Sequence, residues 1–483
     1  MDEIGVSLRL ATHAKTVAIS TRGVAATFFK KAFITIGLLL SCVLLLLIPL
    51  SYAQVSADDP HQSEPPISET RTEPWYKKIK WEWGGHVKAQ GGGSWADDKS
   101  FFRLVDVGPY YDGSVEVRLT GKLSFDQWGY FEAHHETILS GGDTRRKIHA
   151  LRQRYPFLFS TGLMITDPLN DDRRLMDLTW TIHEDDQYII YNRFDRLSLT
   201  LLPRWGAVTI GRQAVTWGNG LLFNPMDICN PFAPTDIERD YKVGDDMASA
   251  QVNLGTRGDV HVLYVPRRDP VKHSVQWNNS SLAGKLHFAW GSTEFDVMVA
   301  KHYEDAVFGI GSMGYLGGAA WRVDGIWTIL NDTRGKDYYF SLVANIDYSW
   351  VWWKKNFYGF VEFFYNGIGE TDYTEALFDQ DIAERLARGE LFALGRAYLS
   401  GHLRVELHPL INCHLTVINN LADPSGVVQP RIVWDVLQNV QVTVGGTIYY
   451  GRKDTEYGGF RIPGIPFAVR GRDSVNLWVS YYF

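Results

Sequence analysis

From about residue 79 to the C-terminus, the chain consists of short segments in which apolar and polar residues alternate, separated by turn-forming residues. A period of two predicts β-strands, because successive side chains of a strand point to opposite faces of the sheet. The pattern predicts eighteen strands, near residues 80–90, 115–125, 128–139, 190–202, 206–216, 248–254, 258–265, 282–289, 293–301, 306–313, 318–330, 338–350, 357–366, 396–407, 411–420, 427–437, 440–451 and 474–483.

The predicted connections alternate in length along the chain. The even-numbered ones are tight, such as Asp126-Gln127 and Gln438-Asn439, whereas most odd-numbered ones are longer and polar. Short turns on one side and long loops on the other are typical of a closed barrel. The sequence therefore predicts an all-β fold, a transmembrane antiparallel β-barrel of about 18 strands. Sixteen strands remain possible, since one hairpin could be miscounted.

The period of two also assigns each strand a lipid face and a lumen face. In the segment 115–125, Val117 and Leu119 share one face, and Glu116, Arg118 and Lys122 share the other. A charge facing lipid costs about 2–4 kcal/mol at mid-depth, so the charged face is predicted to line a wet lumen. The numbers of positive and negative side chains assigned to the lumen nearly balance. These side chains either form facing rows of opposite charge that hydrate the lumen, or they pair with each other and stiffen the wall. Besides those named, this set contains Arg196, Lys285, Arg322, Arg396, Arg404, Arg431, Glu132, Asp296, Asp324, Asp347, Glu362, Glu406 and Asp435.

Arg212 interrupts the alternation, because it falls on the apolar face of Val208 and Ile210. We expect a β-bulge at Gly211 to redirect this arginine into the lumen; a reversal of the strand's two faces is the alternative.

The loop that follows, 219–246, is rich in proline, aromatic and acidic residues, and we expect it to fold back into the lumen. Four of its carboxylates are expected to face wall arginines such as Arg212, Arg396 and Arg404 and to form a constriction. They are Asp227, Asp236, Glu238 and Asp240. The residues predicted to line the pore or this constriction are Arg118, Lys122, Arg212, Asp227, Asp236, Glu238, Arg239, Asp240, Arg322, Arg396, Arg404, Glu406 and Arg431.

The N-terminal region has the features of an exported protein. Lys30 and Lys31 precede an apolar run, 32–50, and the small-x-small site Ser51-Tyr52-Ala53 follows it. We expect residues 1–53 to be a leader and signal peptide, 54–78 a disordered periplasmic lead-in, and 79–483 the barrel. A retained helical anchor, or lipoprotein cleavage before Cys42, is the alternative.

Composition narrows the possible functions. Aromatic residues make up 14% of the chain, including 17 Trp, as a barrel that meets water at both membrane surfaces requires. The three cysteines form no CxxC motif, and the net charge of −7 argues against nucleic-acid binding. No Gly-x-Ser-x-Gly motif is present, so we expect no enzyme, no cofactor and no metal site. A hydrolase with scattered catalytic residues stays open.

The last ten residues, 474–483, alternate strictly and end on an aromatic residue. This segment resembles the final strand of bacterial outer-membrane barrels, which the barrel-assembly machinery reads. The resemblance implies that Val479, Tyr481 and Phe483 act as an assembly signal.

Further motifs are similar to those of proteobacterial outer-membrane barrels of the porin and alginate-export-like kind, and the similarity runs from about residue 80 to the end. They are Gly211-Arg212-Gln213, Trp217-Gly218-Asn219-Gly220, Asn230-Pro231-Phe232, Phe363-Phe364-Tyr365-Asn366-Gly367, Leu394-Gly395-Arg396-Ala397-Tyr398-Leu399 and Gln429-Pro430.

The resemblance implies a channel in the outer membrane of a Gram-negative bacterium, for passive passage of small hydrophilic solutes or extended saccharides. The alternative is a structural barrel or sheath of a trans-envelope export or electron-transfer complex. Expected partners are lipid, the barrel-assembly machinery and the solute; an oligomer is possible.

Overall fold

The computed structural model describes residues 79–97, 100, 109–154, 156, 171–236, 241–331, 336–461 and 467–483. The predicted leader, signal peptide and lead-in lie outside these residues, so residues 1–53 and 54–78 stay predictions. So do the roles expected of Glu238, Arg239 and Asp240, which also lie outside the described ranges.

Eighteen strands in the described part of the chain form the wall. In the first half they are β1 (Ile79–Trp95), β2 (Tyr110–Phe125), β3 (Gly129–Gly142), β5 (Tyr188–Leu201), β6 (Gly206–Gln213), β7 (Asp245–Asn253), β8 (Gly258–Val265), β9 (Ser281–Trp290) and β10 (Thr293–His302). In the second half they are β11 (Asp305–Leu316), β12 (Ala319–Ile329), β13 (Tyr338–Trp352), β14 (Lys355–Asn366), β15 (Ala397–His408), β16 (Ile411–Asn420), β17 (Ser425–Leu437), β18 (Val440–Tyr450) and β21 (Asp473–Tyr482).

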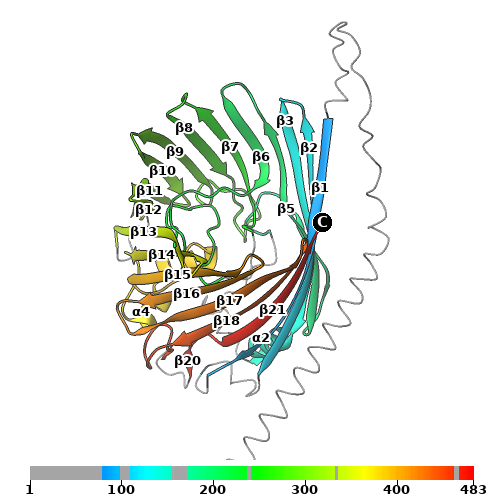
Figure 1. Cartoon of the computed structure of the whole chain (residues 1–483), viewed down its shortest axis with the longest axis vertical. Helices are drawn as coiled ribbons and strands as arrows, with labels where there is room; N and C mark the ends of the chain where they lie inside the picture. Colours follow the sequence, from blue (N-terminus) through cyan, green and yellow to red (C-terminus); the bar gives the residue numbers. More distant parts are fainter. Residues whose placement is uncertain are drawn as a thin grey trace, which may run out of the picture. The chain divides into compact units, whose positions relative to one another are not determined.

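Each wall strand pairs antiparallel with its neighbours along the chain, and β21 pairs with both β18 and β1, which closes the barrel (Figure 1). The predicted fold class and the count of eighteen strands are confirmed. An additional short strand, β4 (Thr179–Glu184), pairs only with β5, and β19 (Phe460–Arg461) and β20 (Ala468–Val469) form a separate hairpin.

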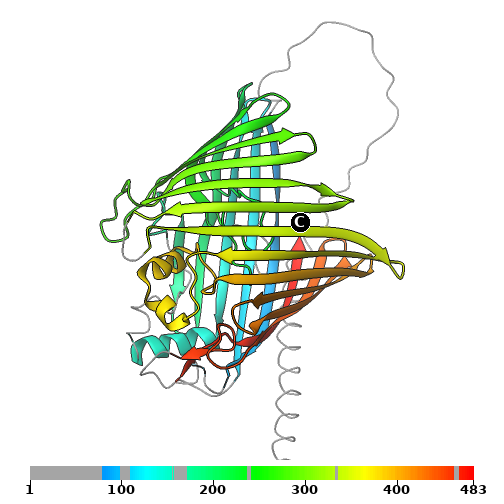
Figure 2. The ribbon, with the colours of Figure 1, turned by 90° about the vertical axis from the view of Figure 1, so that its left-hand side faces the viewer.

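The two ends of the barrel differ as the turn pattern predicted. Eight tight connections, such as 126–128 and 438–439, lie at one end, here called the turn end, together with the C-terminus. The opposite loop end carries the long connections and the helices α2 (Asp143–Arg154), α4 (Tyr373–Phe378) and α5 (Gln380–Arg388), which Figure 2 shows gathered there. None of the helices in the described ranges is long and apolar enough to cross a membrane.

The outer surface of the wall is apolar. Ile210, Ile310 and Val361 are more than half exposed, whereas lumen-facing residues of the same strands are buried. Exposed tryptophans, among them Trp128 and Trp290, lie at the turn end. A continuous belt of exposed aliphatic side chains with aromatic residues at its rim fits a hydrocarbon environment rather than water.

The bulge expected at Gly211 is absent. β6 stays in register with β5 and β7 through this residue, where Gly211 pairs with Ser198 and Met247. The irregularity lies in β5, where Asp195 is left without a partner in β3. Gly211 has a φ of 122°, a conformation that other residues rarely adopt. Glycine at this position therefore allows the local backbone conformation of β6 without a bulge.

The seam of the barrel depends on the last residue. Phe483 exchanges two backbone hydrogen bonds with Gly85, at 2.9 and 3.0 Å. A Cβ atom at Gly85 would lie 2.9 Å from the ring of Phe483 and 2.1 Å from a backbone oxygen, so only glycine leaves room for the ring. β21 therefore joins β1 by both pairing and packing at the turn end.

We predict that Phe483→Ser reduces the amount of folded barrel several-fold, because the ring that packs on β1 is lost. Heat-modifiable migration of the membrane fraction on gels measures this. Phe483→Tyr, which keeps the ring, is the matched control. Normal levels of folded Phe483→Ser protein would show that the terminal residue is dispensable for assembly.

Candidate functional site

The connection between β6 and β7, residues 214–244, is here called the crossing loop. It is described except for 237–240, and it lies inside the barrel (Figure 1). Its contacts reach β2, β8, β12, β13, β14, β15 and β17, which are spread around the circumference. The prediction that this loop folds back into the lumen is confirmed.

Two wall carboxylates hold the first limb of the crossing loop, residues 217–226. Glu362 on β14 accepts hydrogen bonds from the backbone N–H groups of Leu221, Leu222 and Phe223, at 2.6, 3.1 and 2.8 Å. Asp324 on β12 accepts from the backbone and side-chain N–H groups of Asn219, at 2.6 and 2.7 Å. Both carboxylates are fully buried. Each buried N–H group therefore has a strong, charged acceptor, and the limb has one defined position.

Asn345 completes this anchor from the strand between the two acids. Its side-chain amide donates to the backbone oxygen of Asn219 at 3.0 Å and to Glu362 at 3.2 Å. Asn345 lies directly opposite Glu362 in the pairing of β13 with β14. The three polar side chains thus form one continuous patch on the lumen face.

Apolar packing supports the same limb. The ring of Phe223 stacks on Phe364 with centroids 4.5 Å apart and lies 5.3 Å from the ring of Tyr398. Trp217 and Met226 are buried in a second cluster with wall residues of β7, β8 and β10. Stacking of this kind adds about 0.5–1.5 kcal/mol beyond the area buried.

The return limb is held on the opposite wall. The hydroxyl of Tyr241 donates to Glu116 on β2, and the guanidinium of Arg118 lies 3.5 Å from the centroid of the same tyrosine ring. Burial, with the nearby carboxylates of Glu136 and Glu116, raises the pKa of Tyr241 well above its ordinary range, so the hydroxyl stays a donor. Earlier in the loop, before residues 237–240, the backbone oxygen of Thr235 accepts a hydrogen bond from the side chain of Gln429 on β17 at 2.8 Å.

Asp227 of the crossing loop does not pair with a wall arginine, contrary to the sequence prediction. Asp227 pairs with Lys242 of the same loop, with Nζ 2.6 Å from Oδ2. Burial raises the pKa of Asp227 to about 6, although Lys242 opposes that shift. Asp236 forms a backbone turn with Ala233. At these positions the expected electrostatics are reversed, because wall acids bind the first part of the loop and Lys242 of the loop neutralises Asp227. Glu238 and Asp240 lie outside the described residues.

Arg212 is fully buried and so does not line open space, which corrects the predicted role. Its guanidinium donates to Asp246 at 2.8 Å and Asp171 at 3.2 Å, and to the backbone oxygens of Met176 and Phe194. A buried arginine needs such a full set of acceptors. This residue joins the ends of β5, β6 and β7 to the loop after 171.

The other predicted wall residues occupy three kinds of environment. Arg118 is covered by Tyr241 and pairs with Glu136 and Asp195, so it too does not face open space. Arg322 pairs with Asp347 at 2.6 Å, and Arg396 pairs with Glu370 at the loop end. Partly exposed side chains on the lumen faces are those of Lys122, Arg404, Glu406 and Arg431. Several of the charged lumen residues are therefore paired with each other, which is the second of the two roles predicted for them from the sequence.

The anchoring role of Glu362 and Asp324 was missed, although both were assigned to the lumen. A usable signal was present: the segment 217–223 has backbone donors and apolar side chains but no acceptor-bearing side chain besides Asn219. Such a segment inside a barrel requires acceptors from the wall. Lys242 and Asp246 were also missed. In the described ranges no group of three metal-ligating side chains is present.

We predict that Glu362→Gln loosens the crossing loop. The neutral amide loses the charge that holds three N–H groups, and a hydrogen bond to a charged group contributes about 1.5–3 kcal/mol. Single-channel recordings should show a higher mean conductance or frequent openings. Glu304→Gln is the matched control, because Glu304 is exposed in the connection between β10 and β11 and accepts from Asn278 of another connection. Equal conductance and equal opening frequency in the two variants would contradict the role of Glu362 as an anchor of the crossing loop.

A pH dependence follows from Asp227. Its pKa in the packed loop, about 6, lies above its ordinary value of 3.8, so the packed loop binds the proton more tightly than a released loop. The packed state therefore gains stability as pH falls from about 6 to about 4, and loses that gain as pH rises through 6. Openings should be rarer at pH 5 than at pH 7.5. In Asp227→Asn the difference between the two pH values should be smaller; an unchanged dependence would contradict the assignment.

Comparisons with known proteins found likeness to solved structures alone. No family model matches the chain, and no curated protein matches it. Similar solved structures include Acinetobacter baumannii OccAB1 (8% identity, TM-score 0.49, covering 85% of this chain and 98% of that one). Others are Pseudomonas aeruginosa OccK5 (OpdH), at 9% identity, TM-score 0.47 and coverage of 83% and 98%, and a BenF-like porin from Pseudomonas fluorescens Pf-5, at 8% identity, TM-score 0.45 and the same coverage. Likeness at this level concerns the fold alone.

Proposed function

We propose that the protein is a porin-like channel in the outer membrane of a Gram-negative bacterium, through which small hydrophilic solutes diffuse. The observation that carries the proposal is a closed eighteen-strand wall, apolar outside and charged inside, with one loop anchored across its lumen. A barrel of this size encloses an aqueous space unless something fills it. The crossing loop narrows that space and sets a constriction.

The partly exposed charges give the channel its selectivity in this proposal. Arg404 on β15 and Arg431 on β17 both pair with His414 on β16, which lies between them. His414 Nδ1 is 3.5 Å from Nε2 of His402 on β15. Lys122 lies on β2. These side chains can meet a passing solute, whereas Arg118 and Arg212 are already covered. We infer a modest preference for anions.

A structural sheath is the second candidate. Such a barrel would enclose a partner, but the lumen here already holds the crossing loop, which is fixed on both sides. That occupancy favours a channel over a sheath. No catalytic activity, cofactor or metal is proposed. The proposal also includes the signal peptide, the lead-in and assembly through Val479, Tyr481 and Phe483. It further includes extended saccharides as solutes and the alginate-export-like resemblance, and it leaves the oligomeric state open.

We predict that the purified protein conducts ions in planar bilayers and that replacing residues 219–235 with a short Gly-Ser linker raises single-channel conductance. The linker removes the anchored limb and leaves β6 and β7 unchanged. A heat-modifiable barrel in the variant is the folding control. Absence of conductance in the intact protein would favour the sheath, and equal conductance in the two proteins would place the loop outside the ion path.

A further inference from the structure

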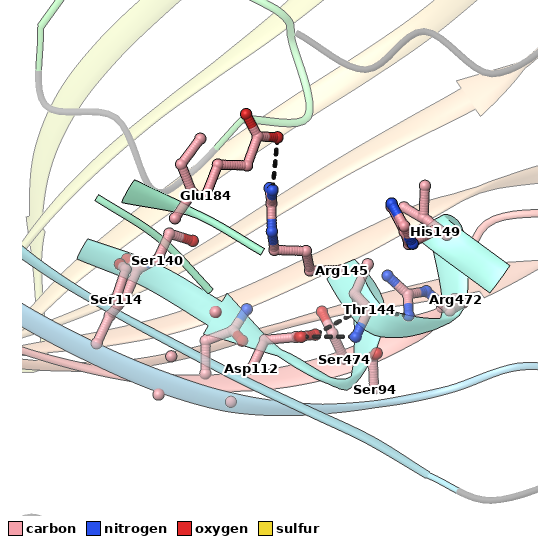
Figure 3. Close-up of a pocket in the computed structure, with 18 of the residues that line it drawn as sticks. Ser94, Asp112, Ser114, Ser140, Thr144, Arg145, His149, Glu184, Arg472 and Ser474 are labelled. Atoms are coloured by element: carbon pink, nitrogen blue, oxygen red, sulfur yellow. Dashed lines mark hydrogen bonds and ion pairs between the residues drawn. The ribbon is translucent and has the colours of Figure 1, made fainter. Parts of the chain in front are cut away.

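A large cavity with a mixed polar and apolar lining lies at the loop end, between α2 and the wall strands β1, β2, β3 and β21 (Figure 3). Its volume is about 930 Å³, near the upper end of the range of about 300–1,000 Å³ for small-molecule sites. None of the residues that anchor the first limb of the crossing loop lines it. A solute entering from the loop end reaches this cavity at the mouth of the barrel.

The wall side of the cavity carries few charges and combines polar side chains with those of Ile189, Tyr191 and Tyr449. Neutral hydroxyl and amide side chains project from four neighbouring strands, and glycines at 91, 92, 113 and 141 leave the backbone accessible between them. These side chains are Gln90, Ser114, Ser140, Ser474 and Asn476. Hydroxyl and amide groups both donate and accept hydrogen bonds, which suits a solute with several hydroxyl groups.

The opposite side of the cavity is basic. Arg145, His149 and Arg152 are spaced at i, i+4 and i+7 in α2, so they share one face of the helix, and that face lines the cavity. Arg472 approaches from the segment before β21 and donates to Thr144 Oγ1 at 2.8 Å. Figure 3 shows Arg145, His149 and Arg472 on the helix side.

The two carboxylates of the cavity are engaged in the structure of its rim. Asp112 accepts from the backbone N–H of Thr144 at 2.8 Å and from its hydroxyl, which fixes the first turn of α2. Glu184 pairs with Arg145 at 2.7 Å. Arg145 and Glu184 neutralise each other, which leaves Arg152 and Arg472 against the single charge of Asp112. The net charge of these side chains is positive, so the cavity favours a negatively charged guest.

We propose that this cavity binds a hydroxylated organic anion, with the hydroxyl groups against the neutral wall and the anionic group against the basic face of α2. A carboxylate and a phosphate share the chemistry that guanidinium groups recognise, so a sugar acid and a sugar phosphate are the two sources. The inference rests on the proposed channel function and names the solute class that the channel collects at its mouth.

The test is isothermal titration calorimetry on the detergent-solubilised full chain with gluconate, glucose 6-phosphate, glucose and acetate. We expect gluconate or glucose 6-phosphate, or both, to bind more tightly than glucose or acetate, and the tighter of the two identifies the anionic group. Arg152→Gln should raise Kd for that anion by about tenfold, the effect of one charge-assisted hydrogen bond. Affinity for glucose should not change.

Arg154→Gln is the matched control. Arg154 belongs to the same helix and is exposed, but it lies two positions on, on another face, and does not line the cavity. Equal weakening by the two variants, equal affinity for glucose and the anions, or no binding by either anion would overturn the site. Ion conductance in bilayers separates the two proposals: conductance without binding overturns the site alone, and binding without conductance overturns the channel alone.

Discussion

The interior arrangement of this barrel depends on one constraint: backbone N–H groups that leave the sheet and enter the lumen need acceptors. The segment 219–223 makes no sheet hydrogen bonds of its own, and Glu362 and Asp324 satisfy its donors. An unmet buried donor costs about 1–3 kcal/mol, so the loop packs only where the wall offers acceptors. The same donors stabilise two carboxylates that would otherwise be buried without a counter-charge. Loop and wall therefore fix each other.

This arrangement divides the charged residues into two groups. Those that the loop encloses, such as Arg118, Asp227 and Lys242, have their partners inside the protein and hold it together. Those that stay partly exposed on the lumen face, such as Arg404 and Arg431, are the ones that can meet a solute. A count of lumen charges from the sequence mixes the two groups, and its near balance of signs says little about selectivity.

Much of the wall could be predicted from the sequence, because alternation is a local property. In 115–125 and 474–483, each residue's face follows from its neighbours. The first predicted strand lies within the observed one, and the second does so except for Phe483. The site could not be predicted in the same way. Arg212 was recognised as an exception, but its partners Asp246, on β7, and Asp171, in the connection after β3, are 34 and 41 residues away. No periodicity specifies such contacts.

The distribution of anchors also bears on how the loop can move. A loop hinged at one side could swing aside by breaking a few contacts near its tip. The crossing loop instead binds His261 on β8, the acids on β12 and β14, Gln429 on β17 and Glu116 on β2. Movement as one body requires all of these contacts to break together, and each contributes about 1 kcal/mol or more. Partial release of one limb is the cheaper motion, so the constriction is expected to fluctuate locally rather than open as a lid.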